Sequence, residues 1–305
     1  MKAKKIILAG GTGFLGKAII NRFSTEGTEI IVLSRGASHK KGNVSYLQWD
    51  GASIGPWSKA LDGADVLINL TGKSVDCRYT EENKKSIISS RVNSTRVLGE
   101  AISLCNLPPK VWLNSASATI YRAAEDKPMD EFSGEIGEGF SEDVCKIWEK
   151  TFNEAIVPKT RKITLRITMI LGKGGGVIPV LRKLVNAGLG GQMGNGKQYI
   201  SWLHEEDFLS ALEWLIDNEK AEGAYNLAAP EPVPNADFMR RMRRILNRSI
   251  GLPASKWMLE IGAFFMRTET ELILKSRRVV PTRLLKEGFV FKFPAAEEAL
   301  KSLLK

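Results

Sequence analysis

Three glycines near the start of the chain have the spacing of a dinucleotide-binding turn. Gly10, Gly13 and Gly16 stand three residues apart, after the basic and apolar run 4–9 and before a helical pattern of apolar residues over 18–23. A buried strand that turns tightly into a helix leaves the first N–H groups of that helix free to hold a pyrophosphate. The predicted contacts of this loop with the cofactor are Gly10, Thr12, Gly13, Phe14, Leu15 and Gly16.

The end of the second predicted strand indicates which dinucleotide binds. The apolar run 29–33 leads into Ser34 and Arg35. Sites selective for NAD usually place Asp or Glu here, because a carboxylate accepts a hydrogen bond from the ribose 2′-OH and repels a 2′-phosphate. A guanidinium favours the phosphate instead. We therefore expect NADP, bound by Ser34 and Arg35, with Lys40 and Lys41 assisting from a loop; the alternative is that Arg35 is a solvated charge at a strand end.

The ends of three later strands supply the remaining predicted cofactor contacts. Asp50 suits the adenine amino group, although an Asp that starts a turn fits the position equally well. Residues 69–72 end the fourth strand, where backbone and small side chains pass the ribose and nicotinamide, and Gly72 allows close approach. The contacts predicted from these strands are Asp50, Leu70, Thr71, Gly72 and Ser115.

The composition is that of an ordinary globular protein. The chain has 305 residues, of which 43% are hydrophobic and 26% charged, so it can bury a sizeable core. It shows no secretory signal pattern and no run of about 18 apolar residues. We therefore expect a cytoplasmic protein with no membrane partner. Cys77, Cys105 and Cys145 lack metal or disulfide spacing, so no metal site is expected.

The formal net charge of +10 raises the question of nucleic-acid binding, and segment 240–248 contains five arginines. The same segment has the pattern of an amphipathic helix, with Phe238 and Met242 on the face opposite the arginines. No helix-turn-helix, zinc-finger or aromatic RNA-binding motif accompanies it. We expect a solvated basic face and keep nucleic-acid binding as a minor hypothesis.

Strand-like apolar runs alternate with helical patterns through the first two-thirds of the chain. Such alternation predicts an α/β fold, a doubly wound parallel sheet of Rossmann type that collects ligands at the carboxyl ends of its strands. The predicted strands are 6–9, 30–33, 44–49, 66–70, 111–115 and 163–167, and the helices between them include 80–104 and 141–156.

The remaining sequence predicts a smaller substrate lobe and a helical C-terminal unit. We expect a Rossmann domain over residues 1–248 that includes lobe segments at about 168–202 and 225–248, followed by a C-terminal domain over 249–305. Within the lobe, the pattern favours a helix over 177–187, a strand near 199–202, a helix after His204 and a strand near 224–227. The proline-rich run 230–234 is predicted to be a loop or linker.

Taken together, these segments resemble the extended short-chain dehydrogenase/reductase superfamily, in its sugar-nucleotide epimerase and dehydratase branch. The match is nearest to an atypical subgroup of nucleoside-diphosphate-sugar epimerase-like proteins, and it covers almost the whole chain. The tail, 277–281 and 284–289, resembles the C-terminal domain of unknown function found in that subgroup. The other segments that carry the resemblance are 10–16, 69–72, 89–96, 115–118, 148–149 and 202–207.

The resemblance also shows what this chain lacks. Typical members use a Tyr in a YxxxK motif to move the proton, with its pKa lowered by the Lys, and a Ser that hydrogen-bonds the reacting group. Ser117 occupies the place of that Ser. Aligning Glu149 with the usual Glu of the next helix places Ser141 at the Tyr and Cys145 at the Lys, so the catalytic pair is absent. Arg91 falls where extended members usually have Asn.

Four residues are therefore the catalytic candidates, and we expect them to cluster near the nicotinamide: Ser117, Tyr121, Cys145 and Arg91. Tyr121 either moves a proton or shapes the substrate pocket. Cys145 is either a thiolate activated near Arg91 or a packed structural thiol. Lys146 lies about 100° away on the helix and is expected to be solvated.

Three more polar residues are candidates for the same region. Lys73 is placed to reach a substrate phosphate, or is simply exposed. Arg166, at the end of the sixth strand, either binds an anionic substrate or pins the lobe. His204 precedes a helix with Asp207 in its first turn, so capping or packing fits it better than a role as catalytic base.

The sequence thus predicts an NADP-binding, epimerase/dehydratase-like oxidoreductase with an atypical active site. The substrate is expected to be a small anionic or nucleotide-linked molecule, and the protein a possible homodimer. The alternative is a non-catalytic NADP(H)-binding sensor or regulatory protein, which the missing Tyr and Lys favour and the retained Ser117 does not.

Overall fold

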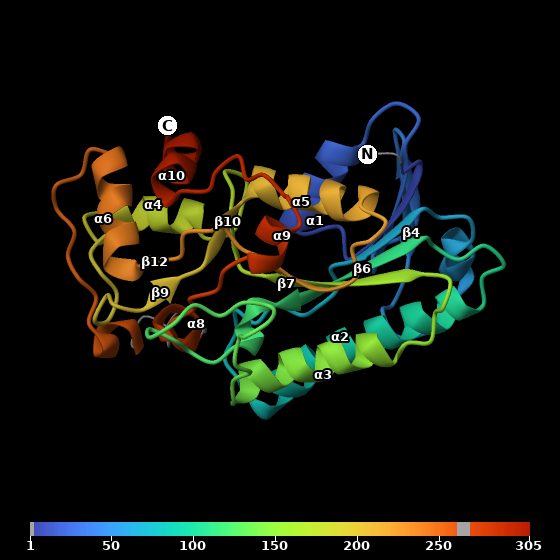
Figure 1. Cartoon of the computed structure of the whole chain (residues 1–305), viewed down its shortest axis with the longest axis horizontal. Helices are drawn as coiled ribbons and strands as arrows, with labels where there is room; N and C mark the ends of the chain where they lie inside the picture. Colours follow the sequence, from blue (N-terminus) through green and yellow to red (C-terminus); the bar gives the residue numbers. More distant parts are fainter. Residues whose placement is uncertain (1–2, 261–268) are drawn as a thin grey trace.

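The computed structural model describes residues 3–260 and 269–305 (Figure 1). Among these residues the main sheet has eight strands in the order β11-β7-β6-β5-β1-β2-β4-β3, and only β3 runs antiparallel to its neighbour. The order reverses between β1 and β5, which is where a doubly wound sheet binds its ligand. The strands of this sheet are β1 (Lys5–Ala9), β2 (Glu29–Ser34), β3 (His39–Lys41), β4 (Val44–Gln48), β5 (Val66–Asn69), β6 (Val111–Ser117), β7 (Arg161–Ile167) and β11 (Gly223–Leu227).

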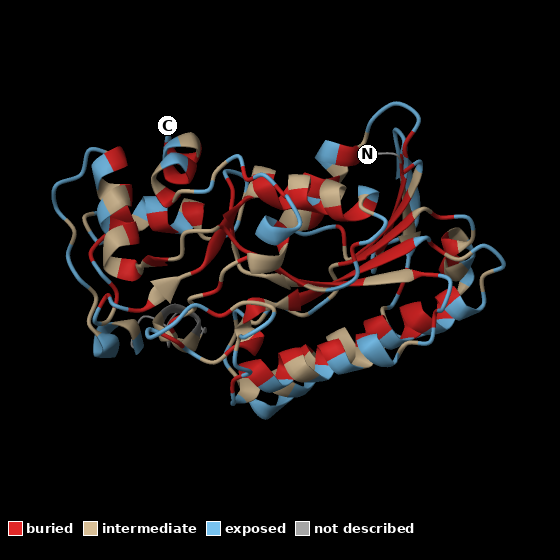
Figure 2. Ribbon diagram, in the orientation of Figure 1, coloured by how far each residue is buried: buried red, intermediate tan, exposed pale blue. Residues whose placement is uncertain are grey.

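Helices cover both faces of the sheet (Figure 1). On one face lie α2 (Glu81–Ser103) and α3 (Phe140–Glu154), and on the other α1 (Phe14–Phe23) and α5 (Glu205–Asp217). The central strands are buried on both faces, as Figure 2 shows, which explains their near-continuous apolar runs. Two short 3₁₀ helices, η1 (Pro56–Leu61) and η2 (Ala118–Ile120), follow β4 and β6. The doubly wound sheet predicted from the sequence is confirmed.

A smaller lobe stands at the carboxyl end of the sheet, on the left in Figure 1. It packs through apolar residues of its helices, and its core is continuous with one side of the main sheet. Its elements are β8 (Met169–Leu171), α4 (Ile178–Asn186), β9 (Tyr199–Ile200), β10 (Trp202–His204), β12 (Val233–Pro234) and α6 (Asn235–Ile245).

The C-terminal segment is helical, as predicted, and adds to the same core. Its helices are α8 (Glu271–Leu274), α9 (Thr282–Lys286) and α10 (Ala296–Leu304). Leu300 and Leu303 of α10 are buried with the lobe residues. The predicted C-terminal unit also includes residues 261–268, which lie outside the described residues.

The structure corrects the sequence prediction at two short segments. Lys40 and Lys41 belong to strand β3, which pairs with β4, rather than to a loop. Part of the proline-rich run forms strand β12, which pairs antiparallel with β9. Both strands have only two or three residues, too few for an alternating pattern to be recognised.

Three of the five arginines of the basic segment, Arg240, Arg241 and Arg244, form ion pairs within the molecule. Arg241 pairs with Glu231 at 3.2 Å and with Asp237 at 2.7 Å. Arg244 pairs with Glu297 of α10. Arg243 and Arg248 donate instead to uncharged acceptors, Gly190 O and Asn186 Oδ1, so the ion pairs neutralise part of the segment's charge. No helix in the described part of the chain is long and apolar enough to cross a membrane.

His204 is the N-cap of α5. Its Nδ1 accepts a hydrogen bond from the Glu206 backbone N–H at 3.0 Å, and its Nε2 lies 2.9 Å from Ser302 Oγ. The ring is buried and stacks on Phe293. Burial, together with nearby Lys292 and Lys173, lowers the pKa of His204 to about 4. The histidine therefore acts as a neutral capping group, as the sequence favoured.

We predict that acidification destabilises the protein through His204. Since its pKa lies below the ordinary value near 6.5, the unfolded chain binds the proton more tightly, and stability falls as the pH drops from about 6.5 to 4. The loss due to this residue should be about 3 kcal/mol. Urea unfolding at several pH values measures it. His204→Asn keeps a capping side chain, so its profile should be flatter; equal slopes in both proteins would contradict the prediction.

Candidate functional site

The glycines of the first loop have three different structural roles. Gly10 adopts φ +77°, and a Cβ there would lie 3.0 Å from the Thr71 backbone nitrogen. A Cβ on Gly16 would collide with the carbonyl of Gly11, so this glycine lets the helix pack against the loop. A Cβ on Gly13 would meet no atom within 4 Å. The open space therefore lies at the position where a pyrophosphate approaches a loop of this kind.

The N-terminus of α1 faces the same space. Gly13 is its N-cap and offers no side-chain cap, and the first turn holds no acidic residue. The first N–H groups of the helix are thus available to an anion. Thr12 is exposed beside them, whereas Phe14 and Leu15 are partly buried and turn toward the core.

Two buried hydroxyls at the carboxyl ends of β5 and β6 have no hydrogen-bond partner among the described residues. They are Thr71 Oγ1 and Ser115 Oγ, both predicted cofactor contacts. A buried hydroxyl without a partner is costly. The loop that carries Thr71 is held by Asn69, whose Oδ1 accepts the Thr71 N–H at 3.0 Å and whose Nδ2 donates to Asn114 at 2.7 Å. The residues present therefore fit a bound dinucleotide.

The predicted adenosine end is more open. Arg35 is exposed directly after β2, beside half-buried Ser34, and no side chain in the described ranges pairs with it. Asp50, in contrast, starts a turn: its carboxylate accepts the backbone N–H groups of Ala52 and Ser53. A further hydrogen bond from the Ser53 hydroxyl is the main cause that lowers the pKa of Asp50 to about 2. The turn alternative therefore accounts for Asp50 without a cofactor.

Arg91 is the most unusual charge of the site. Its Nη1 donates to the carbonyls of Lys73 and Ile87, each at 3.0 Å, and its guanidinium stacks over Trp148 at 4.9 Å. A Cβ on Gly72 would lie 3.0 Å from the guanidinium carbon. Burial lowers the pKa of Arg91. No carboxylate among the described residues forms an ion pair with it, so this partly buried cation is not neutralised by the protein.

Cys145 does not behave as an activated thiol. Its side chain is 3% exposed. Burial, reinforced by the Glu149 carboxylate, raises the pKa of Cys145 to about 12, although Arg91 acts in the opposite direction. Burial and the raised pKa favour a packed thiol over a thiolate activated near Arg91, the two interpretations that the sequence left open.

The Tyr121 hydroxyl is also engaged, in two hydrogen bonds within the protein. Its ring is 1% exposed, and its hydroxyl donates to Asn226 Oδ1 at 3.0 Å and accepts from Arg166 at 2.7 Å. Burial raises its pKa. Arg166 in turn makes two bonds of 2.9 Å to Glu149. These hydrogen bonds tie β7 and the residue after η2 to α3 and β11, so the Tyr121 hydroxyl and the Arg166 guanidinium are both engaged within the protein.

The remaining polar candidates have local partners. Ser117 donates to Thr119 Oγ1 at 2.9 Å and is half-buried after β6. Lys73 donates to Asn83 at 2.7 Å. Lys146 pairs with Asp143, as expected of a solvated lysine. Arg91 thus lies against Gly72 and interacts electrostatically with Cys145, whereas Tyr121 belongs to a separate network.

Sequence reasoning missed Tyr79. Its hydroxyl lies 3.4 Å from Ser141 Oγ, and its ring packs edge-on against Phe140 at 4.8 Å. The signal available was an aromatic residue just before the Thr80 cap of α2, in an otherwise polar segment that follows the carboxyl end of β5.

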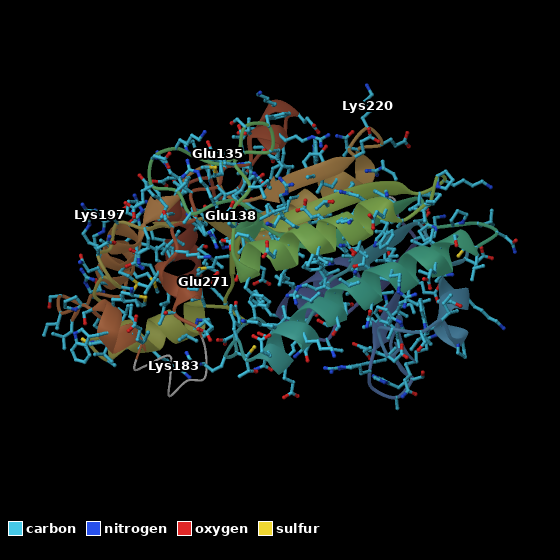
Figure 3. The ribbon with its side chains drawn as sticks, turned by 90° about the horizontal axis from the view of Figure 1, so that it is seen from below. Glu135, Glu138, Lys183, Lys197, Lys220 and Glu271 are labelled. Carbon is cyan, nitrogen blue, oxygen red and sulfur yellow. The ribbon has the colours of Figure 1, made fainter. Side chains whose placement is uncertain are left out.

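The C-terminal segment joins the site through charges. Glu142 on the first turn of α3 is 1% exposed and pairs with Lys275 at 3.0 Å and Arg277 at 3.2 Å. Glu269 accepts the Tyr79 backbone N–H at 2.9 Å. Figure 3 labels Glu271 on this segment and Glu138 just before α3, at the same end of the molecule. The segment is therefore part of the wall around Ser141.

This loop, sheet and charge arrangement can be compared with known proteins. Residues 6–228 match the model of the NAD dependent epimerase/dehydratase family. The chain belongs to this family. Residues 254–303 match a domain of unknown function, DUF1731. The family resemblance predicted from the motifs is confirmed.

Similar proteins align with nearly the whole length of this chain. The epimerase family protein YfhF of Bacillus subtilis is 31% identical over 98% of this chain and 97% of its own. Among solved structures, a human epimerase family protein, SDR39U1, crystallised with NADPH, superposes with a TM-score of 0.86 at 28% identity over 98% of each chain. A nucleoside-diphosphate sugar epimerase from Corynebacterium glutamicum gives 0.78 at 26% identity, over 98% of this chain and 58% of that one.

We predict that Gly13→Val removes NADPH binding and leaves the fold intact, because a Cβ at this position meets no protein atom within 4 Å and the side chain extends into the open space. Affinity should fall at least about 100-fold, or ~2.7 kcal/mol. Fluorescence titration with NADPH and thermal unfolding measure the two effects. The matched variant Gly16→Ala should instead lower stability by about 1–3 kcal/mol, as overpacking does. Wild-type affinity in Gly13→Val would show that the phosphate loop is misplaced.

We also predict that Cys145 resists alkylation at neutral pH. Its thiol is buried, and its raised pKa keeps it protonated, whereas Cys77 is partly exposed. Iodoacetamide labelling at pH 7.5, read by peptide mass spectrometry, should modify Cys77 first and Cys145 only after unfolding. Rapid labelling of Cys145 in the native protein would restore the activated-thiolate interpretation.

Proposed function

We propose that the protein is an NADP(H)-dependent oxidoreductase of the epimerase/dehydratase type. The observation that carries this is the open space at Gly13 beside the uncapped N-terminus of α1, together with the exposed, unpaired Arg35 after β2. These groups suit a pyrophosphate and a 2′-phosphate respectively. The NADPH in the human relative supports the same cofactor. When bound, NADP(H) would supply or accept a hydride.

The substrate is proposed to be anionic, possessing a carboxylate or phosphate near its reacting carbon. Arg91 supports this, because its guanidinium is partly buried, lies beside Gly72 and has no carboxylate partner among the described residues. A desolvated cation of this kind is stabilised when an anion binds. A nucleotide-linked sugar acid has the required chemistry.

The second candidate function is an NADP(H)-binding sensor without turnover. Two observations favour it: the hydroxyl of Tyr121 is engaged on both sides, and the thiol of Cys145 stays protonated. On this reading the anion held by Arg91 would be an effector. The two candidates share the cofactor site and differ in whether hydride transfer occurs.

We predict that wild type binds NADPH more tightly than NADH, and that Arg35→Ala removes this preference. Losing a charge-assisted hydrogen bond to the 2′-phosphate should cost about 1–3 kcal/mol of NADPH affinity and leave NADH affinity unchanged. Fluorescence titration of both cofactors measures it. Arg96→Ala is the control, since that guanidinium pairs with Glu100 on α2. Equal or tighter binding of NADH by wild type would refute the choice of NADP(H).

A further inference from the structure

Tyr79 is a phenol in the wall of the site that the function proposed above leaves unused. Its hydroxyl has one partner among the described residues, Ser141 Oγ at 3.4 Å, which is a long and weak hydrogen bond. The side chain is half-buried. Burial raises the pKa of Tyr79, as do the nearby Glu271 and Glu269 carboxylates and Cys77, and the Ser141 bond acts in the opposite direction. The phenol is thus protonated at neutral pH and its proton is available.

The other proton donors predicted for the site are already engaged. The Tyr121 hydroxyl donates to Asn226 and accepts from Arg166. Cys145 is buried, with a pKa of about 12. Lys146 is exposed and paired with Asp143. Tyr79 is the remaining acidic O–H group in this part of the described structure.

Arg91 lies close enough to Tyr79 to influence it. The electrostatic interactions of Arg91 with Tyr79 and Cys145 raise the pKa of the guanidinium, against the larger effect of burial. Because such interactions are reciprocal, Arg91 favours negative charge on the Tyr79 oxygen, against the larger opposing effects of burial and of the Glu271 and Glu269 carboxylates. A phenol that must release and regain a proton needs a cation of this kind.

The C-terminal segment holds the phenol in place. Glu269 accepts the Tyr79 backbone N–H at 2.9 Å and pairs with Arg78 at 3.6 Å. On the other side, Phe140 packs against the ring at 4.8 Å. Tyr79 is therefore fixed between α3 and the C-terminal segment, although it comes from a loop.

We propose that Tyr79 is the proton-transfer residue of this enzyme, an inference that rests on the proposed function. The chemistry supplied by the bound cofactor is a hydride, which reduces a substrate carbonyl carbon and leaves an alkoxide. The Tyr79 O–H bond then breaks, its proton passes to the alkoxide oxygen, and the Ser141 hydroxyl relays a replacement proton from water. In the oxidative direction, the Tyr79 phenolate takes the proton of the substrate hydroxyl as the hydride leaves carbon.

The experiment uses NADP⁺ and UDP-glucuronic acid, which combines a nucleotide, secondary hydroxyls and a carboxylate for Arg91. Stopped-flow absorbance at 340 nm reports hydride transfer. In wild type the rate should rise about tenfold per pH unit from pH 7 to 9, because the phenolate fraction grows tenfold per unit below the raised pKa of Tyr79. Tyr79→Phe should slow transfer at least about 100-fold and abolish the pH slope. Calorimetric affinities for both ligands should change less than about threefold.

Two further variants serve as controls. Tyr46→Phe removes a hydroxyl from β4 and should leave rate and slope unchanged. Ser141→Ala keeps the phenol, so it should lower the rate a few-fold and retain the slope; if Tyr79→Phe does not fold, an unchanged rate in Ser141→Ala overturns the proposal. Wild-type rate in Tyr79→Phe overturns it, as does a retained slope or a loss confined to affinity.

The failure of the proposed function has a different signature. A wild-type protein that does not bind NADP⁺ refutes the dinucleotide site itself. A wild-type protein that binds NADP⁺ without any hydride transfer to it from UDP-glucuronic acid overturns the role of Tyr79 and supports the sensor.

Discussion

The close approach of the loops after β1 and β5 is the constraint on which the rest of the site depends. The Gly10 N–H donates to the Leu33 carbonyl at 3.0 Å, and the Leu70 N–H donates to the Ala9 carbonyl at 2.9 Å, so the ends of three strands are tied together. Only a residue without a Cβ can occupy position 10, because of its positive φ and the nearness of Thr71. This geometry brings the helix N-terminus beside the loop that carries Thr71 and Gly72.

Two arginines of the site show how a neutralised charge differs from one available to a ligand. Arg166 is bound to Glu149 by two hydrogen bonds, and removing one partner of such a buried pair typically costs about 3–5 kcal/mol. The charge of Arg166 is therefore neutralised by Glu149 and is not available to a ligand. Arg91 has backbone carbonyls and the face of Trp148 as its contacts. These orient the guanidinium without cancelling its charge, which leaves the attraction for an anionic ligand.

The sequence predicted the sheet and the dinucleotide loop well because both depend on local patterns: buried parallel strands give continuous apolar runs, and the turn requires glycine at fixed positions. It could not predict the partners of Tyr121 or Cys145. Whether a phenol is free depends on Asn226, 105 residues away, and on Arg166 of a neighbouring strand. Tyr79 was missed for the same reason, since Ser141 lies 62 residues further along the chain.

The C-terminal segment compensates the buried charge of one carboxylate, that of Glu142. Glu142 is almost fully buried on the first turn of α3, where an uncompensated charge would be strongly destabilising. Its compensating cations, Lys275 and Arg277, both come from the C-terminal segment. The turn that carries Ser141 is thus stable in this position only with that segment docked. The C-terminal segment therefore stabilises the structure around the Ser141 and Tyr79 hydroxyls, which are the groups proposed to transfer protons.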